Sequence, residues 1–109
     1  MEEEFITYCR HNNMEGVNEC LSRGVDVNSK GDWGGCLTGL MFACNAGNSA
    51  IVSRLVEVPG LDINYQDEDG ETAAHYASNE PSYDPGHTEC VRILAETGRV
   101  DWNKRNKRG

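Results

Sequence analysis

The stretch "DEDGETAAHYASNEPSYDPGH", from Asp67 to His87, decides the fold, because it supports two very different interpretations. Its two histidines and its many carboxylates could form a metal site or an acid–base pair. Alternatively, the stretch could be one unit of a pattern that repeats along the chain. The whole sequence must therefore be searched for that pattern before any single residue is interpreted.

The pattern does recur along the chain. The phrases "VDVN", "LDIN" and "VDWN" end at Asn28, Asn64 and Asn103, at intervals of 36 and 39 residues. The segment "TGLMFAC" (38–44) matches "TAAHYAS" (72–78), and "GNSAIVSRLV" (47–56) matches "GHTECVRILA" (86–95). A looser copy of the second motif is "NNMEGVNECL" (12–21). Three copies in register indicate three structural units.

Each unit predicts two short helices and a turn. In the second unit, Ile51, Val52, Leu55 and Val56 share one face of a helix with 3.6 residues per turn. The matching positions are Val17, Cys20 and Leu21 in the first unit, and Cys90, Val91, Leu94 and Ala95 in the third. A glycine follows each second helix, where a left-handed C-cap is favoured: Gly24, Gly60 and Gly98. The sequence predicts helices near residues 3–11, 14–22, 39–46, 49–57, 73–79 and 88–97.

This register resembles the ankyrin repeat, in which "T-P-L-H-x-A-A", "G-H-x-E-V-V-x-L-L" and "G-A-D-V-N" follow one another. The resemblance covers nearly the whole chain and is strongest in the third copy. It implies an all-α ankyrin-repeat solenoid of stacked antiparallel helix pairs with projecting turns. The implied boundaries are an N-terminal capping repeat at 1–30, a second repeat at 31–66, a third at 67–105 with an inserted loop at 79–85, and the start of a truncated fourth at 106–109.

The resemblance also gives the histidines structural roles. Thr72 is expected to cap a helix, and His75 is the motif histidine, which in the family forms a local hydrogen bond with that residue. His87 and Cys90 could share one helix face, but zinc needs about four ligands and no others lie nearby in sequence. The acidic run at 67–71 lacks the distal Glu of an EF-hand loop. We therefore expect no metal and no cofactor.

Composition limits the class of partner and the cellular compartment that we expect. The net charge of −8 disfavours nucleic acid and favours a protein partner with a basic contact patch. The start "MEEEF" does not resemble a signal peptide, and no apolar run is long enough to span a membrane. Five cysteines without a C-x-x-C pair suggest reduced thiols and a cytoplasmic or nuclear location. Cys36 is expected in an exposed turn and the other four in the core.

By resemblance, the chain is a non-enzymatic protein-binding module, part of a longer array, that presents turn tips and first helices to its partner. The candidate contact residues are Trp33, Gly34, Leu37, Asn45, Ala46, Glu68, Asp69, Glu71, Asn79, Glu80, Lys107 and Arg108. Tyr83 joins them because insertions in repeats often lie on the binding face. Trp33 is the sharpest candidate, since tryptophan is enriched at interface hot spots, although it could instead fold back onto its own turn.

Other interpretations remain open. The chain could be a small thiol- or metal-dependent enzyme with the 79–85 insert as a lid, which would require a pocket and a perturbed acid or base. It could also be a spacer within a larger protein. The C-terminal side lacks the polar residues of a terminal repeat, so we expect it to be covered by further repeats or by self-association. Alternatively, Val100 and Trp102 could fold over it.

Overall fold

The structure, a computed structural model, describes residues 2–31, 36–78 and 85–102. Six helices follow one another in these residues: α1 (Glu2–Arg10), α2 (Met14–Ser22), α3 (Gly39–Ala46), α4 (Ser49–Val56), α5 (Ala73–Ser78) and α6 (Pro85–Glu96). Within the same residues, the one β feature is an isolated antiparallel bridge between Lys30 and Thr38. The predicted all-α fold is confirmed.

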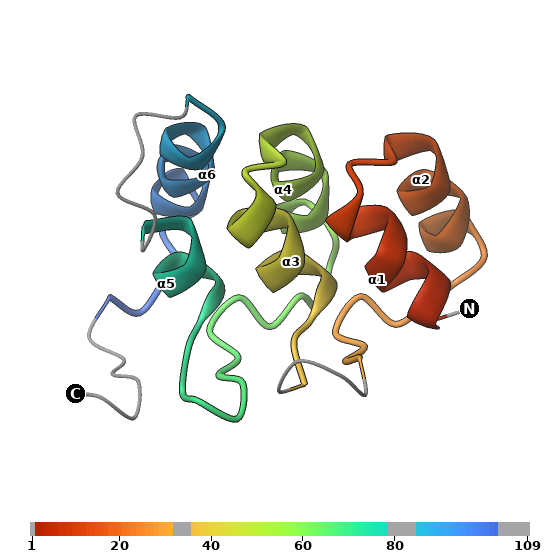
Figure 1. Ribbon diagram of the computed structural model, residues 1–109, viewed down its shortest axis with the longest axis horizontal. Helices are drawn as coiled ribbons and strands as arrows, with labels where there is room; N and C mark the ends of the chain where they lie inside the picture. The colour runs from red at the N-terminus through yellow and green to blue at the C-terminus, as the bar shows by residue number, and fades with distance from the viewer. Residues whose placement is uncertain (1, 32–35, 79–84, 103–109) are drawn as a thin grey trace.

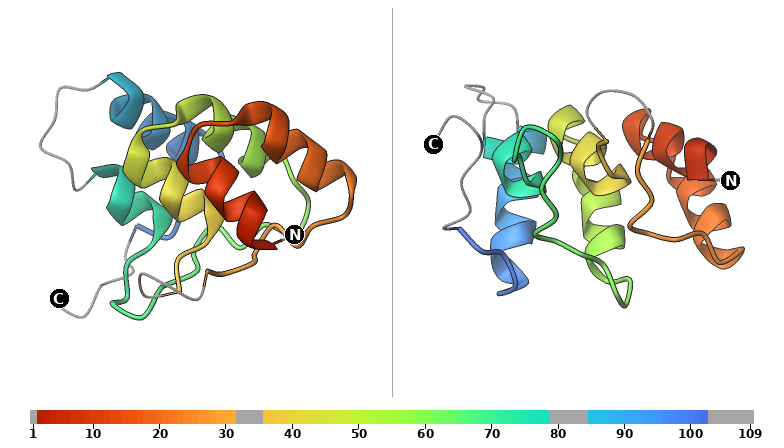
Figure 2. Two further views of the ribbon diagram at one scale, coloured as in Figure 1. Left: turned by 45° about the vertical axis from the view of Figure 1, so that its right-hand side comes forward. Right: turned by 90° about the horizontal axis from the view of Figure 1, so that it is seen from below.

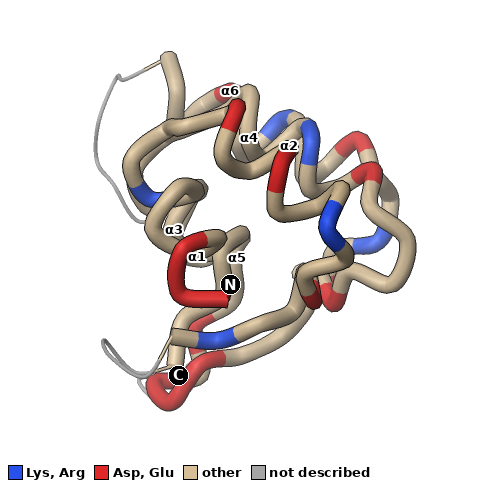
Figure 3. Tube along the Cα trace, turned by 90° about the vertical axis from the view of Figure 1, so that its right-hand side faces the viewer, with Lys and Arg blue, Asp and Glu red and all other residues tan. Residues whose placement is uncertain are grey.

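The helices form two layers (Figure 1). In one layer α1, α3 and α5 lie side by side, and in the other α2, α4 and α6 do the same. An end-on view separates the layers clearly (Figure 3). The long connections between successive helix pairs project together beyond the first helices (Figure 2). This arrangement stacks one helix pair on the next, as in a solenoid.

The helix termini follow from the local sequence. Asn13 Oδ1 accepts a hydrogen bond from the Gly16 backbone N–H at 3.0 Å, and Thr38 Oγ1 accepts one from Met41 at 3.3 Å. At α5 the contacts are reciprocal. His75 Nδ1 accepts from the Thr72 backbone N–H at 2.9 Å, and Thr72 Oγ1 accepts from the His75 backbone N–H at 3.3 Å. Such caps satisfy N–H groups that a helix cannot pair internally, and the predicted Thr72–His75 interaction is confirmed.

The predicted apolar face of the second helices forms the core. Ile51, Val52 and Leu55 of α4 are fully buried, and complete burial of such a side chain contributes about 1.5–3 kcal/mol. The third unit is less completely covered, because Leu94 is buried while Ala95 is exposed. The four cysteines expected in the core, Cys9, Cys20, Cys44 and Cys90, are all buried.

Gly39 allows α1 and α3 to pack closely. It occupies the position where the repeat motif has proline, at the first residue of α3. A Cβ atom built on Gly39 would lie 2.9 Å from Cys9 Sγ and 3.1 Å from Phe5 Cε2. Carbon atoms in a packed interior rarely approach so closely, so this residue must stay small for the first two repeats to dock.

Asparagines join successive repeats through one repeated pair of hydrogen bonds. Asn28 Nδ2 donates to the Gly60 carbonyl at 2.8 Å, and Asn28 Oδ1 accepts from the Asp62 backbone N–H at 2.7 Å. One repeat later, Asn64 Nδ2 donates to the Arg99 carbonyl at 2.9 Å, and Asn64 Oδ1 accepts from the Asp101 backbone N–H at 2.8 Å. The recurring asparagine of the sequence therefore links successive repeats at both of these boundaries.

Two expectations need correction. The last helix begins at Pro85, not at residue 88, so the predicted 79–85 loop is wrong at its final residue. Proline is favourable at the first position of a helix, because its fixed φ suits the helix and its missing N–H would have no partner there. Leu37, expected as a contact residue in a turn, is 6% exposed and belongs to the core. Residues 79–84 lie outside the described residues.

Candidate functional site

The acidic turn at 67–71 is held rigidly by its first residue. Asp67 is buried, and its Oδ1 atom accepts hydrogen bonds from the backbone N–H groups of Asp69 and Glu71, both at 2.9 Å. The Asp67 N–H donates to the Glu71 carbonyl at 3.0 Å, and the hydroxyl of Tyr76 donates to Asp67 Oδ2. Burial, followed by this hydrogen bond, raises the pKa of Tyr76. The carboxylate of Asp67 is therefore structural.

The fixed turn directs two other carboxylates outward. Glu68 and Asp69 are exposed at the tip, and we call these two residues the acidic tip. Glu71 was expected to join them, but its side chain is 13% exposed and lies 3.9 Å from His75 Nδ1. A turn whose backbone is already ordered costs less to order when a partner binds.

The acidic tip is tied to the preceding turn. Cys36 Sγ donates to Glu68 Oε1 at 3.2 Å, and the Tyr65 hydroxyl donates to the Cys36 carbonyl at 3.2 Å. Lys30 Nζ lies 4.6 Å from the centre of the Tyr65 ring, within cation–π range. The sequence analysis missed Lys30 and Tyr65 as neighbours of this tip. The signal was available, since Tyr65 directly follows the phrase "LDIN" and Lys30 stands two residues after the end of "VDVN".

The remaining candidates are divided between exposed and undescribed positions. Asn45 and Ala46 are exposed at the end of α3. The Asn45 carbonyl pairs with His87 Nε2 at 2.8 Å, which confirms a structural contact for that histidine. Seven candidates lie outside the described residues: Trp33, Gly34, Asn79, Glu80, Tyr83, Lys107 and Arg108.

Three of the buried thiols are poor candidates for a nucleophile. Burial raises the pKa of Cys9 to about 12 and also raises the pKa of Cys20. The pKa of Cys44 is raised well above its ordinary value, first by a hydrogen bond with Cys90 and then by burial. Since the thiolate is the reactive form, these environments suit cysteines that pack as small apolar residues. Among the described residues, no three His, Cys, Asp or Glu side chains are grouped to hold a metal ion.

The fold and the repeated contacts agree with a comparison of the sequence against known families. The family model for ankyrin repeats in three copies matches residues 5–106. The chain belongs to the ankyrin-repeat family. Among the residues that the structure describes, no helix combines the length and apolar character needed to cross a bilayer.

Curated relatives of this ankyrin-repeat chain include cortactin-binding protein 2 from several mammals. The protein of Mus musculus is 41% identical over 68 residues, covering 62% of this chain and 4% of that protein. The protein of Neofelis nebulosa is 32% identical over 108 residues, covering 82% of this chain and 6% of that protein. The chain therefore corresponds to a small part of these relatives.

Proposed function

We propose that this chain is a protein-binding module whose acidic tip, Glu68 and Asp69, meets a basic patch on a protein partner. The observation that carries the proposal is the turn itself, in which the buried Asp67 orders the backbone and two neighbouring carboxylates, Glu68 and Asp69, are exposed. Charges at an interface mainly accelerate association and select among partners. Membership of the ankyrin family supports a binding role, and Asn45, with Ala46 beside it, extends the proposed surface along α3.

The proposal extends to the candidates outside the described residues. Trp33 is the proposed apolar anchor, since a tryptophan at an interface buries a large area. Asn79, Glu80 and Tyr83 would enlarge the same surface, and Lys107 and Arg108 would add to it from the following turn. The module would act in a reducing cytoplasmic or nuclear compartment, where its thiols stay reduced.

Affinity capture with charge-reversed variants tests this function. The intact chain, Glu68→Lys and Trp33→Ala would each be used to capture proteins from a cell extract at low and at raised salt. Glu15→Lys is the matched control, because Glu15 is an exposed carboxylate on α2, away from the acidic tip. A partner retained by the control but lost with both Glu68→Lys and Trp33→Ala supports the proposal. A partner retained equally by all four proteins contradicts it.

Cortactin should be assayed directly in the same experiment. The relatives carry cortactin binding in their name, but only 4–6% of their length matches this chain. Purified cortactin that binds the intact chain but not Glu68→Lys would assign the partner. If cortactin does not bind the intact chain, the proposed partner is a different protein.

We also propose that the chain functions within a longer ankyrin array. Val27 and Ile63, at matching positions of the first two repeats, are 6% and 5% exposed, whereas Trp102 at the third matching position is 56% exposed. Val91 and Val100 are half-buried on the same unit. A following repeat would cover these side chains, and self-association is the alternative cover.

Extending the chain by one consensus repeat would separate these possibilities. A longer chain that is more stable than a monomeric 109-residue chain supports the array. A 109-residue chain that dimerises supports self-association. Equal stability, with both chains monomeric, would refute both a following repeat and self-association as the cover of these side chains.

An enzymatic function with the 79–85 insert as a lid is the second candidate. It would require a thiol that reacts unusually fast, and the raised pKa values of Cys9, Cys20 and Cys44 oppose that chemistry. Cys36, half-buried beside Glu68, is the thiol to examine. Reaction of Cys36 much faster than a free thiol near neutral pH would favour the enzyme.

A further inference from the structure

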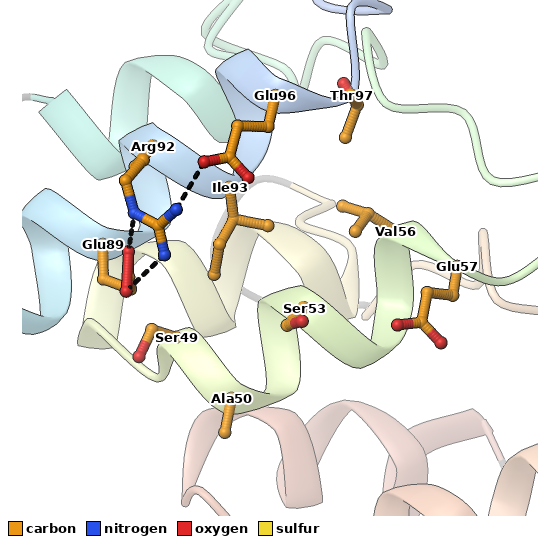
Figure 4. A pocket seen from close by; sticks show the side chains of 10 residues that line it. All are labelled: Ser49, Ala50, Ser53, Val56, Glu57, Glu89, Arg92, Ile93, Glu96 and Thr97. Atoms are coloured by element: carbon orange, nitrogen blue, oxygen red, sulfur yellow. Dashed lines mark hydrogen bonds and ion pairs between the residues drawn. The ribbon is translucent and has the colours of Figure 1, made fainter.

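A groove of about 470 Å³ lies between α4 and α6, in the layer of second helices (Figure 4). It is separate from the acidic tip, which belongs to the turn before α5. The apolar part of the groove comes from Ala50 and Val56 on α4 and from Ile93 on α6. Val56 and Ile93 are partly buried against the core, so this part of the groove stands on a rigid base.

The repeat register explains why the groove is open at this place. Between α2 and α4, Arg54 Nε donates to Asn18 Oδ1 at 2.9 Å and bridges the two helices. One repeat later the same two positions hold Ile93 on α6 and Ser53 on α4, and both line the groove. An isoleucine side chain cannot donate a hydrogen bond, so the bridge between helices is replaced by an apolar surface.

The arginine beside Ile93 does not bridge the two helices either. Arg92 Nη2 donates to Glu89 Oε2 at 2.7 Å, and the guanidinium also pairs with Glu96, so it is held along its own helix (Figure 4). The hydrogen bond from Arg92 lowers the pKa of Glu89 and keeps it ionised. Glu57, at the end of α4, adds a third carboxylate to the lining. Arg99 also lies at this edge, since its Nη2 donates to the Val56 carbonyl at 2.6 Å. Three carboxylates beside two guanidiniums leave the rim with one net negative charge.

An apolar base with an acidic rim defines the chemistry of an occupant. An aliphatic side chain that packs against Val56 and Ile93 would leave water, and this burial favours binding. A cationic group next to it would meet Glu57 and Glu96, of which the latter is 62% exposed at its side chain. Ten residues line the groove, against about 20–30 on each side of a standard protein interface, so it fits a short segment and not a folded domain.

We propose that the α4–α6 groove docks a short segment of a partner protein, in which a lysine or arginine stands beside an aliphatic side chain. This surface is additional to the acidic tip. It would allow one chain to contact a partner both through the turn before α5 and through the layer of second helices. Two linked contacts strengthen binding without either being strong alone.

The test is a titration of the isotope-labelled 109-residue chain, followed by amide chemical shifts. The probe is a capped six-residue peptide of alternating leucine and lysine, and the control peptide has glutamate in place of lysine. The proposal predicts saturating shifts at Ser53, Ile93 and their neighbours with the lysine peptide and none with the glutamate peptide. Spermidine supplies cations without an aliphatic side chain. If spermidine reproduces the shifts, the groove is only a cation site and the proposal is overturned.

Two groove variants sharpen the result. Ser53→Asn combined with Ile93→Arg gives α4 and α6 the same residue pair that bridges α2 and α4. This double variant should lower the affinity for the peptide by about tenfold or more. Glu57→Lys keeps the shape of the groove, and should lower the affinity for the peptide by about fivefold through the lost charge pair. Because Glu57 is exposed, this variant decides the matter even if the double variant folds poorly. Unchanged affinity in Glu57→Lys, or equal weakening by Glu68→Lys, would overturn the groove proposal without affecting the acidic tip.

Discussion

Replacing Asn64 with alanine should measure how strongly one repeat holds the next. The side chain makes two hydrogen bonds across the repeat boundary, to the Arg99 carbonyl and from the Asp101 backbone N–H. A hydrogen bond contributes about 0.5–1.5 kcal/mol net, and access of water to both bonds places them in the lower half of that range. Asn64→Ala should therefore lower the free energy of unfolding by about 1–2 kcal/mol.

Urea unfolding followed by circular dichroism is the assay. Asn28→Ala is the matched variant, because Asn28 makes the same two bonds one repeat earlier. Asn18→Ala is the control, since its side chain makes one bond to Arg54 and should cost no more than about 1 kcal/mol. The reasoning is refuted if Asn64→Ala costs no more than Asn18→Ala, or if Asn28→Ala and Asn64→Ala differ by more than about 1 kcal/mol.

Three further outcomes can be checked on the same chain. Gly39→Ala should lower the free energy of unfolding by about 1–3 kcal/mol in urea unfolding, because the added Cβ meets Cys9 and Phe5; an unchanged midpoint would contradict the close packing of α1 and α3. A thiol reagent near neutral pH should label Cys36 first, and the four buried thiols only at the rate of unfolding; early labelling of Cys9 would contradict the buried core. Because the pKa of Cys9 is raised from 9.0 to about 12, the unfolded chain loses this proton first, so stability should fall progressively as pH rises through this window. Cys9→Ala should make that fall shallower, and an identical slope would show that Cys9 does not contribute.

The repeat register predicted most of the fold because it constrains many residues at once. Ile51, Val52 and Leu55 could be placed in the core from their spacing alone, since a helix presents such positions on one face. The reciprocal contact of Thr72 with His75 followed from the motif. The start of α6 at Pro85 did not follow, because proline is equally compatible with a loop and with the first helical position.

The candidate site was less predictable, because exposure in a turn depends on how the chain folds back. Leu37 was counted with the turn, although it is apolar and directly precedes the helix cap Thr38, where an apolar residue often packs inward, and it does pack in the core. Glu68 and Glu71 are equally charged in sequence, but the hydrogen bonds of Asp67 leave one exposed and turn the other toward His75. The α4–α6 groove was overlooked because it arises from a difference between repeats, Ile93 against Arg54, and not from a shared motif.

The acidic tip is tested most directly by the salt dependence of association with the captured protein partner. Association rate constants of the wild-type chain, Glu68→Lys and the control Glu15→Lys would be measured across a range of ionic strength. We predict that the wild-type and control rates fall together with added salt, and that Glu68→Lys associates more slowly at low salt with a shallower dependence, because screening acts on charges that steer association. Identical rates and identical salt dependence for Glu68→Lys and the wild-type chain would contradict the proposal that the acidic tip meets a basic partner surface.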